Sequence, residues 1–301
     1  MAASLQIQSV IYHNEKDSLM RALTSAANAI RVDRERSGAL STVTLCYGDA
    51  SAQPVFSEDE VTEIANRFVE FFTFRYVFFG ENTGSAKGHN RLGELCESEY
   101  MMIMNPDVLL CPDFFGGMMS MFADPAKEAG MVEARQTPVE HPKEYDRHTL
   151  ETDWATTACA IFPTALFREL KGFDCDTFFL YCDDVDFSWR VRLAGKKVYY
   201  RPDCVVFHAK RLSATGSWQP TSAEIYYSME SSLLMAYKWS NMKRFHKLYS
   251  YFESLDDKNA QKVIRQFEDM KKTGRLPEQL DKDHKVAKFV GDNYTNHRFT
   301  F

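Results

Sequence analysis

Three aspartates within four positions are the feature of this sequence that most directly suggests chemistry. Residues 178–190 read FFLYCDDVDFSWR and carry the carboxylates of Asp183, Asp184 and Asp186. Ionised carboxylates this close repel one another, so a fold keeps them together for a metal, a helix N-terminus or proton transfer. A helix start explains one or two of them, because Asp is favoured at the N-cap and in the first turn. The third aspartate and the apolar residues before it favour a functional interpretation.

Composition excludes several classes of protein. The 301 residues are 45% hydrophobic and 26% charged, which predicts an ordinary folded core and excludes general disorder. A net charge of −6 provides no basic field for nucleic acid. Seven cysteines without a C-x-x-C pair argue against a disulfide framework or zinc site and predict a reducing, cytoplasmic location. The N-terminus does not resemble a signal peptide, and no apolar run reaches the ~20 residues of a membrane span.

The elements that must position the aspartates are predicted from the apolar pattern. It indicates strands at 5–12, 40–47, 75–79 and 100–104, and helices at 16–31, 61–72 and 84–96. This alternation predicts an α/β fold with a mostly parallel sheet flanked by helices. Ligands bind such sheets beyond the carboxyl ends of the strands, where four polar residues fall: Asp49, Asn82, Asn105 and Asp107.

The second half of the chain changes character twice. A polar segment at 138–152 is expected to form a loop over the site, followed by a strand at 155–162, a short helix at 163–170 and a strand at 196–200. From Thr221 to Lys272 we expect helices rich in charge and aromatic residues, and from Asp281 a poorly packed tail. The predicted organisation is a site-bearing domain at 1–215 and a C-terminal helical region at 216–301.

Three segments, taken in order, resemble the family 2 inverting glycosyltransferases of the GT-A fold, in particular their bacterial rhamnosyltransferase-like branch. They are ENTGSAKGHNR at 81–91, MMIMNPDV at 101–108, and the stretch from Ala158 to His208 that contains KGFD, FLYCDDVD and YRPDCVVFH. The branch shows N-x-G-(x)3-G-x-N, a strand ending in N-P-D, then G-F-D-(x)3-F-(x)2-Y-x-[ED]-D-x-D and P-x-(x)3-H. The resemblance covers residues 5–210 and implies a Rossmann-like GT-A domain that takes a nucleotide-diphosphate sugar.

The first segment is expected to contact the donor diphosphate. Two glycines frame a turn that lets the backbone approach a phosphate, and a helix N-terminus follows to meet its charge. An ordinary helix start with solvated cations explains the same residues equally well. The candidate substrate contacts in this segment are Asn82, Gly84, Lys87, Asn90 and Arg91.

The second segment lies where the family has its Asp-x-Asp metal motif. Here Asn105 replaces the first acid and only Asp107 remains, with Asn105 kept as a substrate contact. The resemblance implies that a divalent cation, Mg²⁺ or Mn²⁺, offsets the diphosphate charge at Asp107, with His208 as a second ligand. Locally, a strand-end turn and a structural histidine remain alternatives.

The third segment implies the general base. The family places this base on the second acid of the pair, here Asp184, which would take the proton of the acceptor hydroxyl. Asp183 would position the acceptor or adjust the pKa of Asp184 through like-charge repulsion. Asp186 forms an i,i+4 pair with Arg190 and is interpreted as structural. Trp154, after the polar loop, is a further candidate substrate contact.

The nucleobase end matches the family less well. The family has Asp-Asn-x-Ser after the second strand, whereas this chain has Gly-Asp-Ala-Ser at 48–51, so Asp49 is the displaced candidate for the base. Asn14, or Tyr12 beside it, is expected at the base or ribose.

The resemblance implies transfer of L-rhamnose or a related sugar from a nucleotide-diphosphate donor to a glycan or glycolipid, with inversion. The missing first acid and the shifted Asp49 leave open a catalytically inactive sugar-nucleotide-binding or regulatory protein. A nucleotidyltransferase is disfavoured, because its glycine- and lysine-rich loop would follow the first strand, where this chain has His-Asn-Glu. A helix at 239–252 with aromatic and basic residues predicts either peripheral membrane contact or packing on its own domain.

Overall fold

The computed structural model describes residues 2–140, 142–209, 219–290 and 294. Its strands are β1 Ala3–Ile11, β2 Leu40–Asp49, β3 Thr73–Phe78, β4 Tyr100–Met104, β5 Val108–Leu110, β6 Ala129–Thr137, β7 Glu151–Thr152, β8 Cys159–Pro163 and β9 Lys197–His208. Its α-helices are α1 Lys16–Arg36, α2 Glu58–Phe68, α3 Gly84–Glu94, α4 Phe114–Ala123, α5 Thr164–Glu169, α6 Asp183–Leu193, α7 Ser222–Lys238, α8 Met242–Ser254 and α9 Lys258–Lys272.

The strands form one sheet in the order β3-β2-β1-β4-β8-β6-β9-β5, with β7 paired to β9. The four strands from β3 to β4 are parallel, as predicted. Beyond β4 the sheet is mixed, because β8 runs antiparallel to both β4 and β6, and β5 and β7 run antiparallel to β9. The parallel half therefore ends at β4, beside the residues that build the site.

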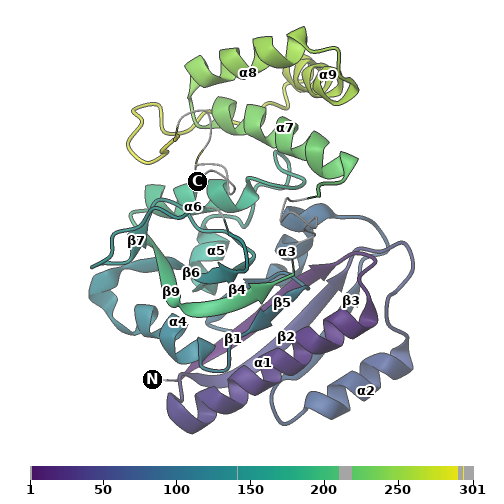
Figure 1. Ribbon diagram of the computed structural model, residues 1–301, viewed down its shortest axis with the longest axis vertical. Coiled ribbons are helices and arrows are strands. Elements are labelled where there is room, and N and C mark those ends of the chain that lie inside the picture. The colour runs from purple at the N-terminus through teal and green to yellow at the C-terminus, as the bar shows by residue number, and fades with distance from the viewer. Residues whose placement is uncertain (1, 141, 210–218, 291–293, 295–301) are drawn as a thin grey trace.

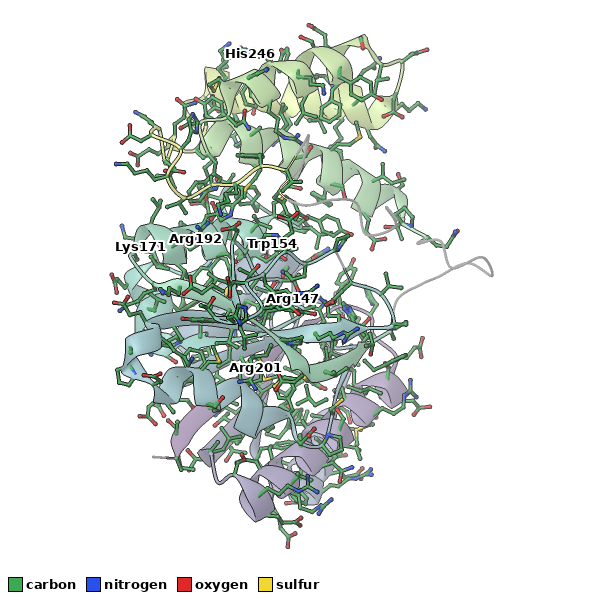
Figure 2. All side chains as sticks on the ribbon, turned by 60° about the vertical axis from the view of Figure 1, so that its left-hand side comes forward. Arg147, Trp154, Lys171, Arg192, Arg201 and His246 are labelled. Atoms are coloured by element: carbon green, nitrogen blue, oxygen red, sulfur yellow. The ribbon has the colours of Figure 1, made fainter. Side chains whose placement is uncertain are left out.

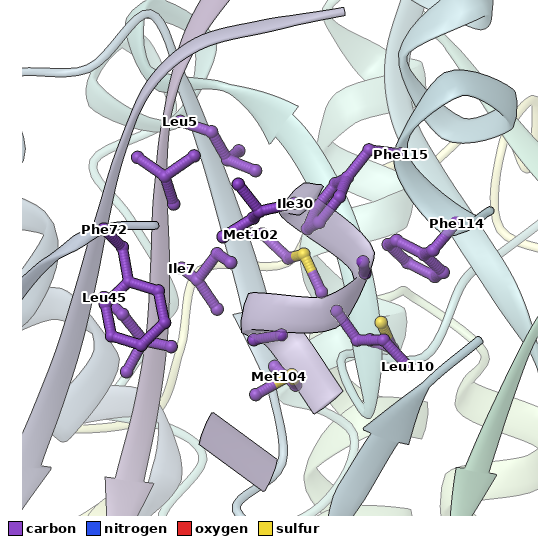
Figure 3. Close-up of a cluster of buried hydrophobic side chains, with 14 of the residues drawn as sticks. Leu5, Ile7, Ile30, Leu45, Phe72, Met102, Met104, Leu110, Phe114 and Phe115 are labelled. Carbon is purple, nitrogen blue, oxygen red and sulfur yellow. The ribbon is translucent and has the colours of Figure 1, made fainter. Parts of the chain in front are cut away.

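Helices cover both faces of the sheet (Figure 1), and the alternation along β4 shows why. Met102 and Met104 point to the face packed by α1 and α4, while Met101 and Ile103 point to the face packed by α3, α5 and α6. Figure 3 shows the first of these layers, where Leu5, Ile7 and Ile30 pack with Phe114 and Phe115. The predicted α/β fold, with a central sheet flanked by helices, is confirmed, although the sheet beyond β4 is mixed and not parallel.

Several elements after β4 were not predicted in full. The strand expected at 196–200 continues to His208 as β9, and β5, α4 and β6 lie in segments for which no element was predicted. Helix α4 is buried on most of its sides, so apolar residues occur all around it. Its sequence therefore lacks the alternation of apolar and polar residues that would indicate a helix, and it also contains two adjacent glycines. The extension of β9 matters most, because it carries His208 to the carboxyl edge of the sheet.

The C-terminal helices α7, α8 and α9 gather at one end of the molecule, with α6 between them and the sheet (Figure 1). Thr221 and Glu224 form a capping box that starts α7. Three aromatic residues of 239–252 face inward: Trp239, Phe245 and Phe252 are buried, and Phe245 packs on Phe267 of α9 at a centroid distance of 4.9 Å. The apolar face for which membrane contact and packing were the two alternatives therefore packs on this helical group.

No helix of the described residues is long and apolar enough to cross a membrane.

A buried ionic network ties α7 to α6. Asp186 accepts hydrogen bonds from Arg190 Nε at 2.8 Å and from Trp239 Nε1 at 3.0 Å, and it pairs with Lys238 Nζ at 2.6 Å. Lys238 also reaches Asp174, again at 2.6 Å. The structural role expected for Asp186 thus includes holding the C-terminal helices. The predicted boundary at 215/216 lies outside the described residues.

The described residues after Asp281, 282–290 and 294, make specific contacts with the protein, in contrast to the predicted loose tail. The Asp281 carboxylate accepts hydrogen bonds from the backbone N–H groups of residues 285–287, and Arg192 donates to the Val286 carbonyl at 2.6 Å. Lys288 pairs with Asp153 at 2.9 Å. These contacts lay the segment back over α6.

Candidate active site

The pairing of β5 with β9 builds the first part of the site. In this antiparallel ladder His208 lies opposite Val108, so its ring comes beside the residue before Val108, which is Asp107. His208 Nε2 is 3.3 Å from Asp107 Oδ1 and 3.4 Å from Asn105 Nδ2. Two residues singled out as metal ligands, far apart in the sequence, are therefore brought together with Asn105.

A buried amide orients the His208 ring. Thr156 Oγ1 accepts a hydrogen bond from Gln136 Nε2 at 3.0 Å, which turns Gln136 Oε1 toward His208 Nδ1 at 2.7 Å. A carbonyl oxygen can only accept, so Nδ1 carries the proton and the Nε2 lone pair is directed at Asp107 and Asn105. Metal-binding histidines are commonly fixed by such a hydrogen bond through the other ring nitrogen.

This donor set fits a divalent cation that is shared with a substrate. Within the described residues no group of three or more His, Cys, Asp or Glu side chains converges, so the protein offers no closed cage. Mg²⁺ typically binds through one or two carboxylates while substrate phosphates and waters complete its shell. Asp107, which is about one-third exposed, and the oriented His208 match that incomplete set.

The carboxylate pair starts α6 after a sharp turn. Tyr181 and Cys182 both have left-handed backbones, with φ values of 69° and 60°. Two consecutive non-glycine residues in this region are rare and are kept where the surrounding structure requires them. The turn reverses the chain so that Asp183 and Asp184 occupy the first turn of α6 and face the cavity described below.

The two carboxylates have different surroundings. Asp184 accepts hydrogen bonds from the N–H of Val185, at 2.8 Å, and from the N–H of Thr157. Asp183 is buried, and within the described residues its Oδ2 has no hydrogen-bond partner. Burial and the charge of Asp184 raise the pKa of Asp183 to about 7, and burial also raises the pKa of Asp184. The backbone donors favour the negative charge on Asp184, with the proton of the pair on Asp183.

Both parts of the site open on one cavity of about 160 Å³. Its lining includes Asn105 and His208 together with Asp183 and Asp184. Trp154, which lies between the sheet and the C-terminal helices (Figure 2), forms part of the wall together with Tyr294; their rings meet edge to face with centroids 5.0 Å apart. The cavity therefore brings His208, the neighbour of Asp107, together with a carboxylate pair and an aromatic wall.

The predicted glycine turn packs against the chain that leads to the carboxylates. Gly84 has φ +66°, and a Cβ atom there would lie 2.5 Å from the Phe179 carbonyl oxygen. Asn82 Oδ1 accepts from the Gly84 N–H at 3.1 Å and closes the turn, while the next N–H, that of Ser85, donates to Phe179 O at 3.3 Å. Glycine is required at 84 by both its backbone angle and its close neighbour.

The other residues of that segment divide into two groups. Lys87 and Arg91 both reach Glu81 on the surface, the lysine at 3.4 Å, and Arg91 also lies over the Phe79 ring. Asn90 instead faces the protein: its amide donates to the Phe173 carbonyl and accepts from the Phe173 N–H, both at 2.8 Å. Asn90 therefore clamps the Gly-Phe turn to α3, which is a packing role and not the expected substrate contact.

The nucleobase candidates show a second departure from expectation. Asp49 is fully buried, and its carboxylate accepts from the N–H groups of Ser51 and Val55, at 2.9 and 2.7 Å, and from the Tyr76 hydroxyl. It shapes the loop after β2 and presents no oxygen to solvent. Asn14 Oδ1 accepts a hydrogen bond from the Tyr12 N–H at 2.8 Å. The Tyr12 ring, just after the end of β1, is half-exposed.

Sequence analysis did not identify four residues at or behind the cavity: Gln136, Glu140, Lys143 and Tyr294. Gln136 would have required the prediction of β6, at whose carboxyl end it lies. Glu140 and Lys143 lie in the polar loop, where charged residues are unremarkable. Tyr294 is remote in sequence and reaches the wall after the packed segment from Asp281.

Comparison with known proteins agrees with this architecture. No protein-family model matches the sequence. Over 141 residues the chain is 25% identical to the rhamnosyltransferase WbbL of Escherichia coli strain K12, a match that covers 38% of this chain and 52% of WbbL. The match thus spans about half the length of that curated relative.

Two solved structures share the fold. GalNAc-T7 with UDP, GalNAc and Mn²⁺ matches 95% of this chain and 57% of that chain, with a TM-score of 0.65 and 10% identity. The mannosyltransferase PcManGT of Pyrobaculum calidifontis, in complex with GDP-Man and Mn²⁺, matches 90% of this chain and 81% of that chain, with a TM-score of 0.53 and 16% identity. The chain therefore has the α/β fold of the GT-A glycosyltransferases.

Proposed function

We propose that this protein is a glycosyltransferase that moves a sugar from a nucleotide-diphosphate donor to a glycan or glycolipid acceptor, with inversion at the anomeric carbon. The observation that carries the proposal is that His208, which lies beside Asp107, lines the same cavity as Asp183 and Asp184. A donor whose diphosphate meets Asp107 and His208 would place its sugar toward the carboxylate pair.

The roles of the residues follow from their chemistry. Asp107 and His208 would hold a divalent cation, which supplies positive charge against the leaving diphosphate. Asp184, oriented by two backbone N–H groups, takes the proton of the attacking acceptor hydroxyl. Asp183 retains its own proton, so the pair carries one negative charge and Asp184 can act as the base. Tyr294 and the largely buried Trp154 form the aromatic wall against which a sugar ring can pack.

L-rhamnose or a related deoxysugar is the proposed donor sugar. The match to a rhamnosyltransferase and the resemblance of the three segments support it. The alternative of an inactive sugar-nucleotide-binding protein rested on the missing acid at Asn105 and on the shifted Asp49. His208 beside Asp107 compensates for the missing acid, and the complete carboxylate pair favours an active enzyme.

The direct test is a panel of nucleotide-diphosphate sugars, screened first for thermal stabilisation with Mn²⁺ and then for nucleotide release with saccharide acceptors. A ligand at 100 times its Kd adds about 2.7 kcal/mol to the free energy of unfolding, so a true donor is readily detected. We expect one donor class to stabilise the protein and to release nucleotide only when an acceptor is present. Stabilisation without transfer across all acceptors would instead support the inactive binding protein.

A further inference from the structure

A buried ion pair lies behind the wall of the cavity and has no assigned role in the proposed reaction. Lys143 Nζ is 2.6 Å from Glu133 Oε2, and the two side chains are only 3% and 1% exposed. The same ammonium donates to the Trp154 carbonyl at 3.0 Å and lies 3.5 Å from the centroid of the Trp154 ring. Lys143 thus joins the polar loop, β6 and the aromatic wall.

Burying two opposite charges is expensive, and such a pair is weak evidence for stability by itself. Burial raises the pKa of Glu133 to about 7, although Lys143 acts against this rise. A fold that needed only to anchor the loop could do so with apolar side chains at no such cost. The position of the ammonium, against Trp154 and near Asp184, indicates what the pair is used for.

The cavity lining explains why a cation behind its wall matters. Among the described residues that line the cavity there is no lysine or arginine. Besides Asp184, the titratable lining groups are Asp183, Cys182, Tyr181, Glu140, His208 and Tyr294, and the ion pair of Glu133 and Lys143 stands behind them. The positive charge of Lys143 lowers the pKa of Asp184 against the effect of burial.

We propose that Lys143 is a positioning residue of the active site: its buried ammonium fixes the Trp154 wall and supplies the positive charge that keeps the Asp184 carboxylate anionic. The inference rests on the proposed function in taking Asp184 as the base. Lys143 does not touch the reacting atoms and acts through Asp184 and Trp154. Glu133 is the buried partner that holds the ammonium in place, and burial raises its own pKa, so the charge that acts on Asp184 is that of Lys143.

The charge of Lys143 gives a sharp test. Lys143→Met keeps the length of the side chain and removes its charge, so the acidic limb of the kcat/KM profile should move up by roughly one pH unit or more. Glu133→Gln keeps the ammonium and replaces a carboxyl that is protonated on this limb, so the limb should not move up. Lys197→Met is the matched control, because Lys197 pairs with Glu151 at 2.5 Å beside the same loop but is 41% exposed; its profile should match that of the wild type.

A measurement without turnover separates this inference from the proposed function. The Asp184 side chain, followed by ¹³C NMR with Asp184→Asn as the assignment reference, should titrate higher in Lys143→Met than in the wild type or in Glu133→Gln. This shift, from a protein that transfers no sugar, would support the charge effect and overturn the function. Normal transfer in the wild type, with an Asp184 titration in folded Lys143→Met identical to that of the wild type, would overturn the role of Lys143 and leave the function standing.

Discussion

His208 Nε2 lies 3.3 Å from Asp107 Oδ1, and the antiparallel register of β5 and β9 brings the two residues together. Neither residue is informative alone, because a strand-end Asp and a single His occur in many proteins. Their meeting, with the ring oriented by Gln136, gives the chain a two-residue donor set in place of the acid that Asn105 replaces.

Removal of the cation should therefore remove activity. With excess EDTA, sugar transfer should fall to background and return on addition of Mn²⁺ or Mg²⁺, and Asp107→Ala should weaken donor binding in the presence of metal. Gln136→Leu, which frees the His208 ring, should weaken metal affinity by roughly 10- to 100-fold. Isothermal titration of Mn²⁺ with nucleoside diphosphate measures both effects. Undiminished transfer in EDTA would contradict the metal role, and would mean that Lys87, Arg91 or other cationic side chains neutralise the leaving diphosphate.

The sequence predicted the parallel half of the fold well, because its strands and helices each show a clear period. Through the order of the segments it also selected Asp183, Asp184 and His208, which line one cavity, and Asp107, which lies beside His208; their roles stay predictions. It could not predict that Asn90 and Asp49 face inward, since the side-chain type of a hydrogen-bonding residue does not reveal its partner. The partners are backbone groups of Phe173, for Asn90, and of Ser51 and Val55, for Asp49.

Replacing Gly84 should disturb both stability and activity. Gly84→Ala forces a side chain into a left-handed backbone and against the Phe179 carbonyl, so we expect a loss of about 2–4 kcal/mol in the free energy of unfolding. Gly38→Ala is the control: its φ is +57°, but no atom lies within 4 Å of the added Cβ, so it should cost only about 1 kcal/mol. Urea unfolding measures the free energy of unfolding of both variants. Equal losses of stability would contradict the prediction, because they would mean that the contact with Phe179 relaxes without strain.

Asp183 should make stability depend on pH. Its pKa is about 7 in the folded protein and 3.8 as the reference value, so between these values the folded state holds a proton that the unfolded state releases. Stability is therefore lost as pH rises through this window. Asp183→Asn removes that loss, and its advantage over the wild type should grow from pH 5 to pH 8, to on the order of 4 kcal/mol. A constant difference at all pH values would contradict the buried, protonated state.

The aromatic wall should govern acceptor binding. Tyr294→Ala removes one of the two rings at the wall, so we expect KM for the acceptor to rise by about tenfold while KM for the donor is unchanged. Tyr251→Ala is the control, since Tyr251 is exposed on α8 away from the cavity. Initial-rate kinetics with each substrate varied in turn provide the comparison. A rise in KM for the donor alone would instead indicate that the sugar-nucleotide, and not the acceptor, binds at the aromatic wall.

The C-terminal half shows why some residues could not be predicted. The aromatic period of 239–252 indicates an amphipathic helix, but it does not say whether a membrane or the protein itself covers its apolar face. Packing on α7 and α9 covers it here. Likewise, nothing in the composition of the segment after Asp281 indicates that three backbone N–H groups would fold onto that carboxylate and carry the chain back over α6.

The identity of the base is the central claim, and one variant tests it most directly. Asp184→Asn preserves the shape of the side chain and removes its ability to accept a proton. Transfer by this variant should fall by roughly 10²- to 10⁴-fold at saturating substrates, while its Kd for the donor, measured by titration calorimetry, stays within about twofold of the wild type. Near-native transfer by Asp184→Asn would contradict the account, and it would direct the search for the base to Asp183 or Glu140.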